Sequence, residues 1–220
     1  KGEAKERALF SVIKRYLKEC KDIRFDGNGY SAEWEKEAKK RGLDTETSVP
    51  LMIDQYLRKS SIQMFTSTGV LSKSELHSRC EVKWENYSMK LQIESRVLGD
   101  LVINHILPAA KRYQTILLQN VQGVKQVFST NEAEKLSEQD ILLIRSIENH
   151  TSAITAKVNN MNKERARANH IDNQRERAIT FHDYVVPLME EIRQHVDDLE
   201  MVIDDQLWPL PKYRELLFIH

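Results

Sequence analysis

Apolar side chains recur every three to four residues over much of the chain, which is the period of an amphipathic helix. The first such stripe lies in residues 9–20 and predicts a helix. A short apolar run at 23–25 has the character of a strand. After it, Ser31 is placed to cap a short helix that Gly42 ends. Further short helices are expected within 51–69, so the first third of the chain is predicted to hold short, mixed elements.

From Ser72 onward the helical pattern becomes much longer. Ser72 and Glu75 have the spacing of a capping box. Pro108 lies inside the pattern that follows and predicts a kink or a break, because proline lacks an N–H donor and crowds the preceding turn. Two more long helices are predicted at 141–161 and 185–203. The expected fold is mainly α, an antiparallel bundle of long helices with a smaller N-terminal region of short helices and at most one short strand.

The composition is consistent with this fold and limits the possible partners and cellular compartment. A chain of 220 residues can bury a core without disulfides, and Gly and Pro together account for only 12 of them. Basic and acidic side chains number 33 each, which argues against nucleic acid or an anionic membrane as a partner. The apolar stretch 97–110 is too short to cross a bilayer. Cys20 and Cys80 are predicted to be buried free thiols, so we expect a cytoplasmic protein.

The last fifteen residues, 206–220, are unusually apolar for a chain terminus. We predict an extended tail there, because the two prolines disfavour helix in the residues before them. The residues expected to dock or form an interface are Trp208, Pro209, Pro211, Tyr213, Leu216, Leu217 and Phe218. They could fold back onto the bundle or dock onto a larger body, and our hypothesis is the second.

Residues 27–32, Gly-Asn-Gly-Tyr-Ser-Ala, match the fingerprint of a dinucleotide-binding turn. The preceding strand is too short, however, and no second strand follows the helix. A tight turn with a helix cap therefore explains the motif, and no cofactor-binding residue is predicted.

The histidines suggest no metal site. No two of them are four residues apart, and Glu191 with His195 is interpreted as a surface pair. The seven histidines are His77, His105, His150, His170, His182, His195 and His220. Acidic pairs are adjacent in sequence, so their side chains diverge on a helix. The residues therefore indicate no catalytic and no metal-ligating residue.

The segment 157–177 is polar on almost all sides and carries a net positive charge. It is interpreted as a solvated hairpin tip, with an anion-binding or partner-binding tip as the alternative. It has no interleaved aromatic side chains on which bases could stack.

Four stretches in this order resemble the C-terminal part of type III glutamine synthetase, the large bacterial form. The first is 23-IRFDGNGYSAEWEKEAKKRGL-43, and the second is 65-FTSTGVLSKSELHSRCEVKWENYSMKLQIES-95. The others are 106-ILPAAKRY-113 and 185-VVPLMEEIRQHVDDLEMVIDDQLWPLPKYRELLF-218. The resemblance covers nearly all of the chain. Each motif alone has little specificity, but their order and spacing together make the match specific.

The resemblance implies a parent enzyme that joins glutamate and ammonia with ATP and a divalent metal, Mg²⁺ or Mn²⁺, in a large oligomer. Its catalytic carboxylates would lie before Lys1, and none can be assigned to a position here. The chain begins Lys1-Gly2 without an initiator Met, so we expect a piece of a longer protein. The predicted segments are the end of the catalytic-domain region and linker at 1–70, the bundle at 71–205 and the tail at 206–220.

By itself this piece is expected to be inactive and to have a structural role in oligomer assembly. Its implied partners are the upstream catalytic domain and neighbouring subunits of the same enzyme. The alternative is a stand-alone helical bundle that acts as a protein–protein interaction module.

Overall fold

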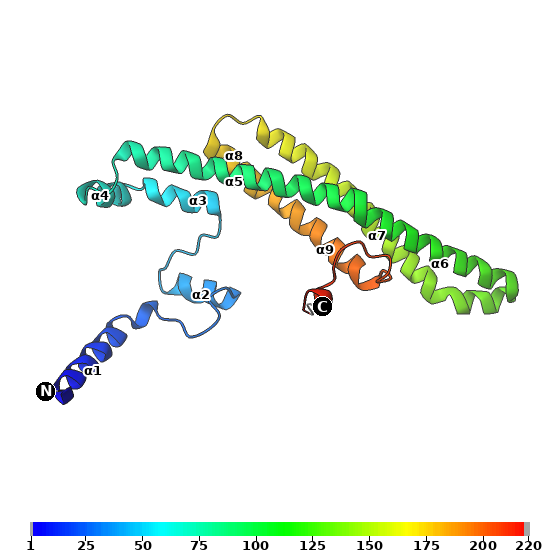
Figure 1. The fold of residues 1–220 in the computed structure, drawn as a ribbon, viewed down its shortest axis with the longest axis horizontal. Coiled ribbons are helices and arrows are strands. Elements are labelled where there is room, and N and C mark those ends of the chain that lie inside the picture. Colours follow the sequence, from blue (N-terminus) through cyan, green and yellow to red (C-terminus); the bar gives the residue numbers. More distant parts are fainter. Residues whose placement is uncertain (1, 218–220) are drawn as a thin grey trace. The chain divides into compact units, whose positions relative to one another are not determined.

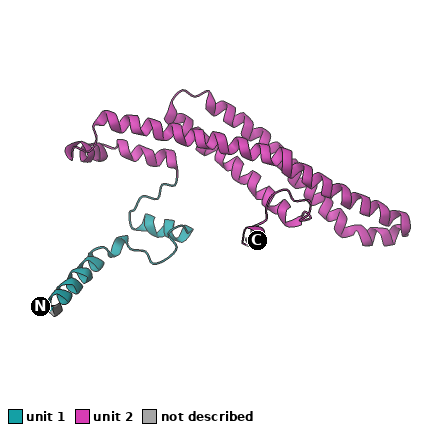
Figure 2. Cartoon of the chain, viewed as in Figure 1, with its two compact units in different colours: residues 1–47 teal, residues 48–220 magenta. Residues whose placement is uncertain are grey.

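The computed structural model describes residues 2–217, which form helices joined by turns (Figure 1). Two compact units divide the chain, residues 1–47 and residues 48–220 (Figure 2). The short helices within 49–67 therefore belong to the same unit as the long bundle. These units are defined by packing and do not test where a catalytic domain would end. The predicted segments 1–70, 71–205 and 206–220 therefore stay predictions.

The N-terminal unit contains α1 (Gly2–Glu19), a 3₁₀ turn η1 (Lys21–Ile23) and α2 (Ala32–Lys40). The expected strand at 23–25 is wrong: η1 and a coil occupy these residues. The reason is that the backbone carbonyls of Asp22 and Arg24 accept hydrogen bonds from the guanidinium of Arg41 instead of a neighbouring strand. The boundaries predicted for α2 are confirmed by the Ser31 cap and by Gly42 at φ 74°.

Three long helical rods form the second unit (Figure 1). The first contains α5 (Lys73–Leu101), the π-helical turn η3 (Val102–Ile106) and α6 (Leu107–Val127). The second is α7 (Thr130–Asn169), which runs back along the first. Hydrogen bonds mark this antiparallel register, because Asn120 bonds Asp140 near one end and Asn169 bonds Gln92 towards the other. The third contains α8 (Gln174–Thr180), the π-helical turn η4 (Phe181–Val185) and α9 (Val186–Val202).

Both π-helical turns lie directly before a helix that has proline in its first turn, Pro108 in α6 and Pro187 in α9. Proline removes an N–H donor and its ring clashes with the carbonyl four residues earlier, so the wider turn relieves the clash while the rod continues. The break predicted at Pro108 is thus confirmed as a local change of helical type. The corresponding π-helical turn before Pro187 was not predicted.

The main core lies along the seam between the rods, and α7 contributes a stripe of buried residues to it. Ile147, Ile154 and Met161 of α7 are each fully buried, and so are Ile192 and Leu199 of α9. Ten further buried members of this cluster are Leu91, Val102, Ile106, Ala110, Leu117, Val158, Ala168, Phe181, Val185 and Ile203. The long amphipathic helices gain most of their stability from this burial.

A smaller cluster holds α3 (Val49–Asp54) and η2 (Gln55–Leu57) against the start of α5. The short helix α4 (Lys59–Ser67) follows η2. The indole of Trp84 donates to the Pro50 carbonyl at 3.1 Å, and Arg175 of α8 forms a two-pronged ion pair with Asp54. Cys80 is buried here as a free thiol, as predicted, and burial raises its pKa. Cys20 is only half-buried.

Two glycines in the second unit should respond in opposite directions to the same change. Gly123 lies within α6 with open space around it, so Gly123→Ala should raise the free energy of unfolding by about 0.5–1 kcal/mol. Gly69 has φ 68°, where a Cβ is strained, so Gly69→Ala should lower the free energy of unfolding by about 1 kcal/mol. Urea unfolding of the two variants checks both signs, and equal shifts would contradict the assignment.

Candidate functional site

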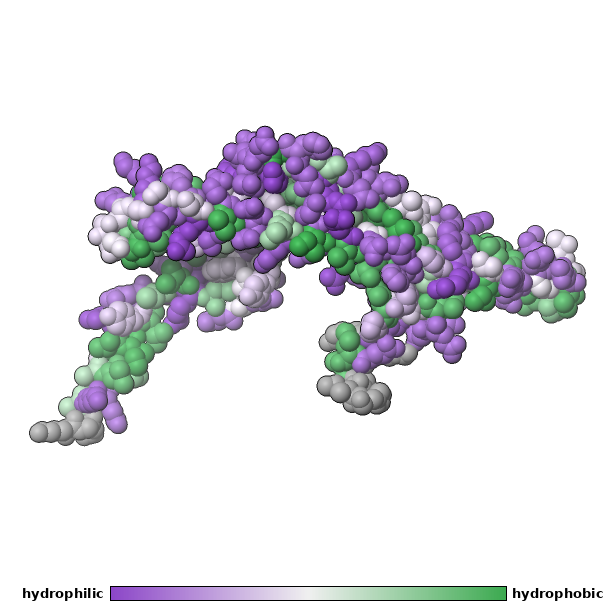
Figure 3. Space-filling view, turned by 45° about the horizontal axis from the view of Figure 1, so that its top comes forward, coloured by the Kyte–Doolittle hydropathy of each residue, from purple (hydrophilic) through white to green (hydrophobic). Residues whose placement is uncertain are grey.

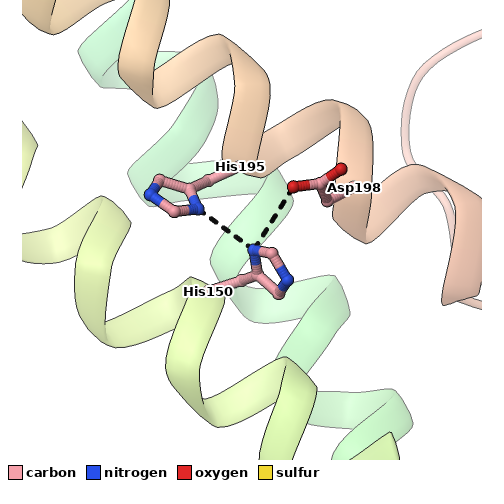
Figure 4. Close-up of side chains that lie close together, drawn as sticks. All are labelled: His150, His195 and Asp198. Atoms are coloured by element: carbon pink, nitrogen blue, oxygen red, sulfur yellow. Dashed lines mark hydrogen bonds and ion pairs between the residues drawn. The ribbon is translucent and has the colours of Figure 1, made fainter.

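Two histidines and an aspartate converge where α7 and α9 lie side by side (Figure 4). His150 comes from α7, and His195 and Asp198 come from α9, one helical turn apart. Nδ1 of His150 is 3.1 Å from Nδ1 of His195 and 3.8 Å from Oδ2 of Asp198. The potential ligand atoms of all three residues lie within 4.8 Å of one another. Within the described residues, this is the cluster suited to sharing a metal ion.

The core seam positions both imidazoles. His150 falls three residues after buried Ile147 and four before Ile154, so it shares their face of α7. His195 has the same relation to Ile192 and Leu199 on α9. The two rings therefore meet edge to face at the margin of the core, 5.3 Å between centroids, and both residues are half-buried.

The surroundings of His195 favour its neutral imidazole. Burial lowers the pKa of His195, and His150 and then Lys157 lower it further, while Asp198 and Glu191 act in the opposite direction. A neutral ring keeps one nitrogen lone pair free, which is the form that accepts a hydrogen bond or binds a metal. Two imidazole nitrogens and a carboxylate oxygen are ligand types that Zn²⁺ uses.

No metal ligand was predicted from the sequence, and this cluster was missed. His195 was paired with Glu191 instead, but Glu191 forms an ion pair with Lys157 across the α7–α9 contact. A partial signal was present, because His195 and Asp198 have the i, i+3 spacing of one helix face. The third member, His150, is 45 residues away from His195, so only the register of the two helices brings it into place.

The glycine-rich turn at 27–32 is held by hydrogen bonds among its own residues. The Asn28 side chain accepts from Tyr30 N–H, and the Asn28 carbonyl accepts from the Ser31 hydroxyl. At Gly27 a Cβ would lie 2.5 Å from the Phe25 ring, which explains that glycine by a close approach within the unit. Among the described residues no strand precedes the turn.

The basic segment 157–177 is largely engaged by the bundle itself. It contains the end of α7, the connection at 170–173 and the start of α8. The guanidinium of Arg167 lies 4.2 Å from the centre of the Tyr184 ring, and that of Arg177 donates to the Ile171 carbonyl. These contacts, with the Arg175–Asp54 pair, give Arg167, Arg175 and Arg177 structural roles.

The apolar tail divides into a buried part and an exposed part. Trp208 is 8% exposed and joins the main core, with Leu207 and Leu210 half-buried against it, so this part folds back onto the bundle. Lys212 donates to the Glu200 carbonyl and anchors the chain to α9. Pro209 and Pro211 are exposed.

The end of the tail is a short helix, α10 (Tyr213–Leu217), and not the extended chain that was expected. Helix resumes there because no proline follows Pro211 and because the Glu215 carboxylate accepts from Lys212 N–H. Leu216 and Leu217 are 67% and 59% exposed. Phe218 lies outside the described residues, and the proposed interface role of the seven tail residues stays a prediction.

One face of α1 is an exposed apolar surface of the N-terminal unit (Figure 3). The stripe predicted from the sequence forms a helix, as expected, but its side chains are exposed rather than packed. Its large members, 41–58% exposed, are Leu9, Val12, Ile13, Tyr16 and Leu17. A one-sided apolar helix that its own unit does not cover indicates an interaction surface.

Residues 8–125, more than half of the chain, match the family model of the glutamine synthetase C-terminal domain. The chain belongs to this family. It is 45% identical over 217 residues to a glutamine synthetase of Bacteroides fragilis and 28% identical over 229 residues to the type-3 glutamine synthetase of Dictyostelium discoideum. The alignments cover 99% and 100% of this chain, and the resemblance drawn from its motifs is confirmed.

The glutamine synthetase C-terminal domain seen here spans about 30% of the length of these relatives. A glutamine synthetase of Butyrivibrio fibrisolvens, 25% identical, is covered to the same extent. His150, His195 and Asp198 lie beyond the range of the family model but inside the span shared with the relatives. None of the described helices is long and apolar enough to cross a membrane.

Substitutions at Trp208 should separate apolar burial from hydrogen bonding. Its indole Nε1 is buried without a protein partner, so Trp208→Phe removes an unsatisfied donor and should change the free energy of unfolding by only about 1 kcal/mol. Trp208→Ala loses the packing and should lower it by roughly 3–5 kcal/mol. Denaturant unfolding of the 220-residue chain measures both, and a harmless Trp208→Ala would show that the tail does not belong to the core.

Proposed function

We propose that this chain is the C-terminal, non-catalytic part of a glutamine synthetase and that it serves the assembly of the larger enzyme. The observation that carries the proposal is the apolar face of α1, which its own unit does not cover, because burial of such a face against a partner is favourable. The relatives are about three times as long as this chain, so the remaining part of such an enzyme is the partner that fits.

Bond formation would then belong to residues outside this chain. The reaction joins glutamate and ammonia at the expense of ATP, and it needs carboxylates that hold Mg²⁺ or Mn²⁺ beside the phosphates. The one converging ligand set among the described residues contains two histidines and a single carboxylate, which suits a different class of metal. ATP and its metal are accordingly not assigned to any residue here.

The apolar face of α1 is large enough for its burial to stabilise a docked complex. Full burial of one large exposed aliphatic or aromatic side chain contributes about 1.5–3 kcal/mol, and the five residues of this face, each about half exposed, would still gain roughly half of that. The exposed leucines of α10 offer a second, smaller contact. We assign the first surface to the catalytic part of the enzyme and the second to a neighbouring subunit.

A charge on the α1 face should destabilise the whole enzyme and spare the isolated chain. In the full-length synthetase, Ile13→Asp places an unpaired carboxylate in the covered face and should weaken the contact by roughly 2–5 kcal/mol. In the isolated chain Ile13 is 47% exposed, so the melting temperature should hardly change. Thermal unfolding and light scattering of both proteins give the two readouts.

The matched control is Ser11→Asp, which adds the same charge to the opposite face of α1. We expect the full-length enzyme with Ser11→Asp to keep the melting temperature and assembly size of the wild type. Equal behaviour of Ile13→Asp and Ser11→Asp in the full-length enzyme would refute the docking role of this face.

The size of the native polypeptide distinguishes this proposal from a stand-alone interaction module. An antibody raised against the chain should detect, in source cells, a band roughly three times heavier than 25.7 kDa, because the relatives are longer by about that factor. A band at 25.7 kDa would instead favour the independent helical module.

A further inference from the structure

We propose that His150, His195 and Asp198 form a binding site for a divalent transition metal such as Zn²⁺, which clamps α7 to α9. The site is independent of glutamine synthesis and of the docking surfaces proposed above. It rests on the convergence of three ligand side chains from two helices that are packed together by the core (Figure 4).

The spacing of the ligand atoms fits a small tetrahedral ion. Ligands bound to Zn²⁺ at 2.0–2.1 Å in tetrahedral geometry are separated from each other by roughly 3.3 Å. The two Nδ1 atoms are 3.1 Å apart, and Asp198 Oδ2 is 3.8 Å from Nδ1 of His150. The Asp198 side chain is 56% exposed, so it has room to rotate towards the ion.

The backbone supplies the preorganisation that a metal site needs. His195 and Asp198 lie one turn apart on α9 and can chelate from a single face. His150 is held opposite them because its neighbours on α7, Ile147 and Ile154, are fully buried. The ion would therefore find its ligands already close together.

The Lys157–Glu191 ion pair lies next to the cluster and limits the ligand set. Glu191 is four residues before His195, but its carboxylate is already held by Lys157. Three protein ligands therefore remain, and the fourth position falls to water or a small external ligand, as in open zinc sites. The half-buried histidines and the exposed Asp198 leave a route for the ion from solvent.

Ligand chemistry selects the class of metal. Imidazole nitrogen suits Zn²⁺, Co²⁺, Ni²⁺ and Cu²⁺, whereas Mg²⁺ and Ca²⁺ prefer sites made of oxygen ligands. Without metal, one Nδ1–H donates to the other Nδ1. On binding, each ring would carry a proton on Nε2 and offer the Nδ1 lone pair to the ion.

A metal at this place would join the third rod directly to the second. Because the unfolded chain does not hold the three ligands together, binding stabilises the folded state by mass action. The effect should be largest on opening of α9 away from α7, which breaks the site.

The test uses the 220-residue chain stripped of metal with a chelator. Calorimetric titration with Zn²⁺ alone should give one saturable site per chain. The melting temperature should rise by roughly 5–10 °C when Zn²⁺ exceeds its Kd about 100-fold. Co²⁺ serves as a second probe, because its visible absorption reports tetrahedral nitrogen and oxygen ligation. Mg²⁺ should produce neither the heat nor the shift.

Three ligand variants and one control decide the assignment. His150→Gln, His195→Gln and Asp198→Asn should each weaken Zn²⁺ binding by roughly 10-fold or more. His77→Gln changes an exposed histidine of α5 and should bind like the wild type. Asp198→Asn alters the most exposed of the three ligands, so it remains informative even where a histidine variant does not fold.

Two results would overturn the site. The first is the absence of saturable Zn²⁺ binding by the wild-type chain. The second is equal Zn²⁺ affinity in the wild type, the His77→Gln control and the folded ligand variants, which would place the ion elsewhere on the surface.

Discussion

Burial of one aliphatic stripe on α7 is the interaction on which the bundle depends. α7 is 40 residues long and highly polar on its outer side, and its inner side contributes Ile147, Ile154, Val158 and Met161 to the core. These side chains pack against α5 and α6 on one side and α9 on the other. A helix of this length has no other large source of stability, since propensity and exposed ion pairs each contribute only tenths of a kcal/mol.

This seam also fixes the register between α7 and α9, and the register brings polar side chains of the two helices together. The antiparallel alignment that places Ile154 beside the α9 stripe also brings His150 next to His195 and Lys157 next to Glu191. The π-helical turns before Pro108 and Pro187 keep the rods continuous, so the apolar stripe is maintained past both prolines. The apolar packing thus brings the polar cluster together at the edge of the core. His150, His195 and Asp198 supply its potential metal ligands.

The two compact units differ in whether a helical apolar stripe is buried within the unit. In the second unit the large aliphatic residues of the seam are buried, and even the terminal tail places Trp208 inside. In the N-terminal unit the apolar face of α1 is uncovered, although it has the same helical period (Figure 3). The function proposed above would account for this difference, because the part of a longer enzyme outside this chain would then cover the α1 face.

The sequence by itself determined the elements, because helix formation follows from local period, caps and breakers. The Ser31 and Ser72 caps, the left-handed Gly42 and the disturbance at Pro108 all occur where local chemistry placed them. The motifs at 23–43, 65–95, 106–113 and 185–218 also sufficed to indicate the family. Only the tertiary structure decided which apolar stripes are buried, that 23–25 is not a strand, and that the tail splits at Lys212. It alone assembled His150 with His195 and Asp198, because proximity across 45 residues depends on how two helices align, and no local pattern encodes that alignment.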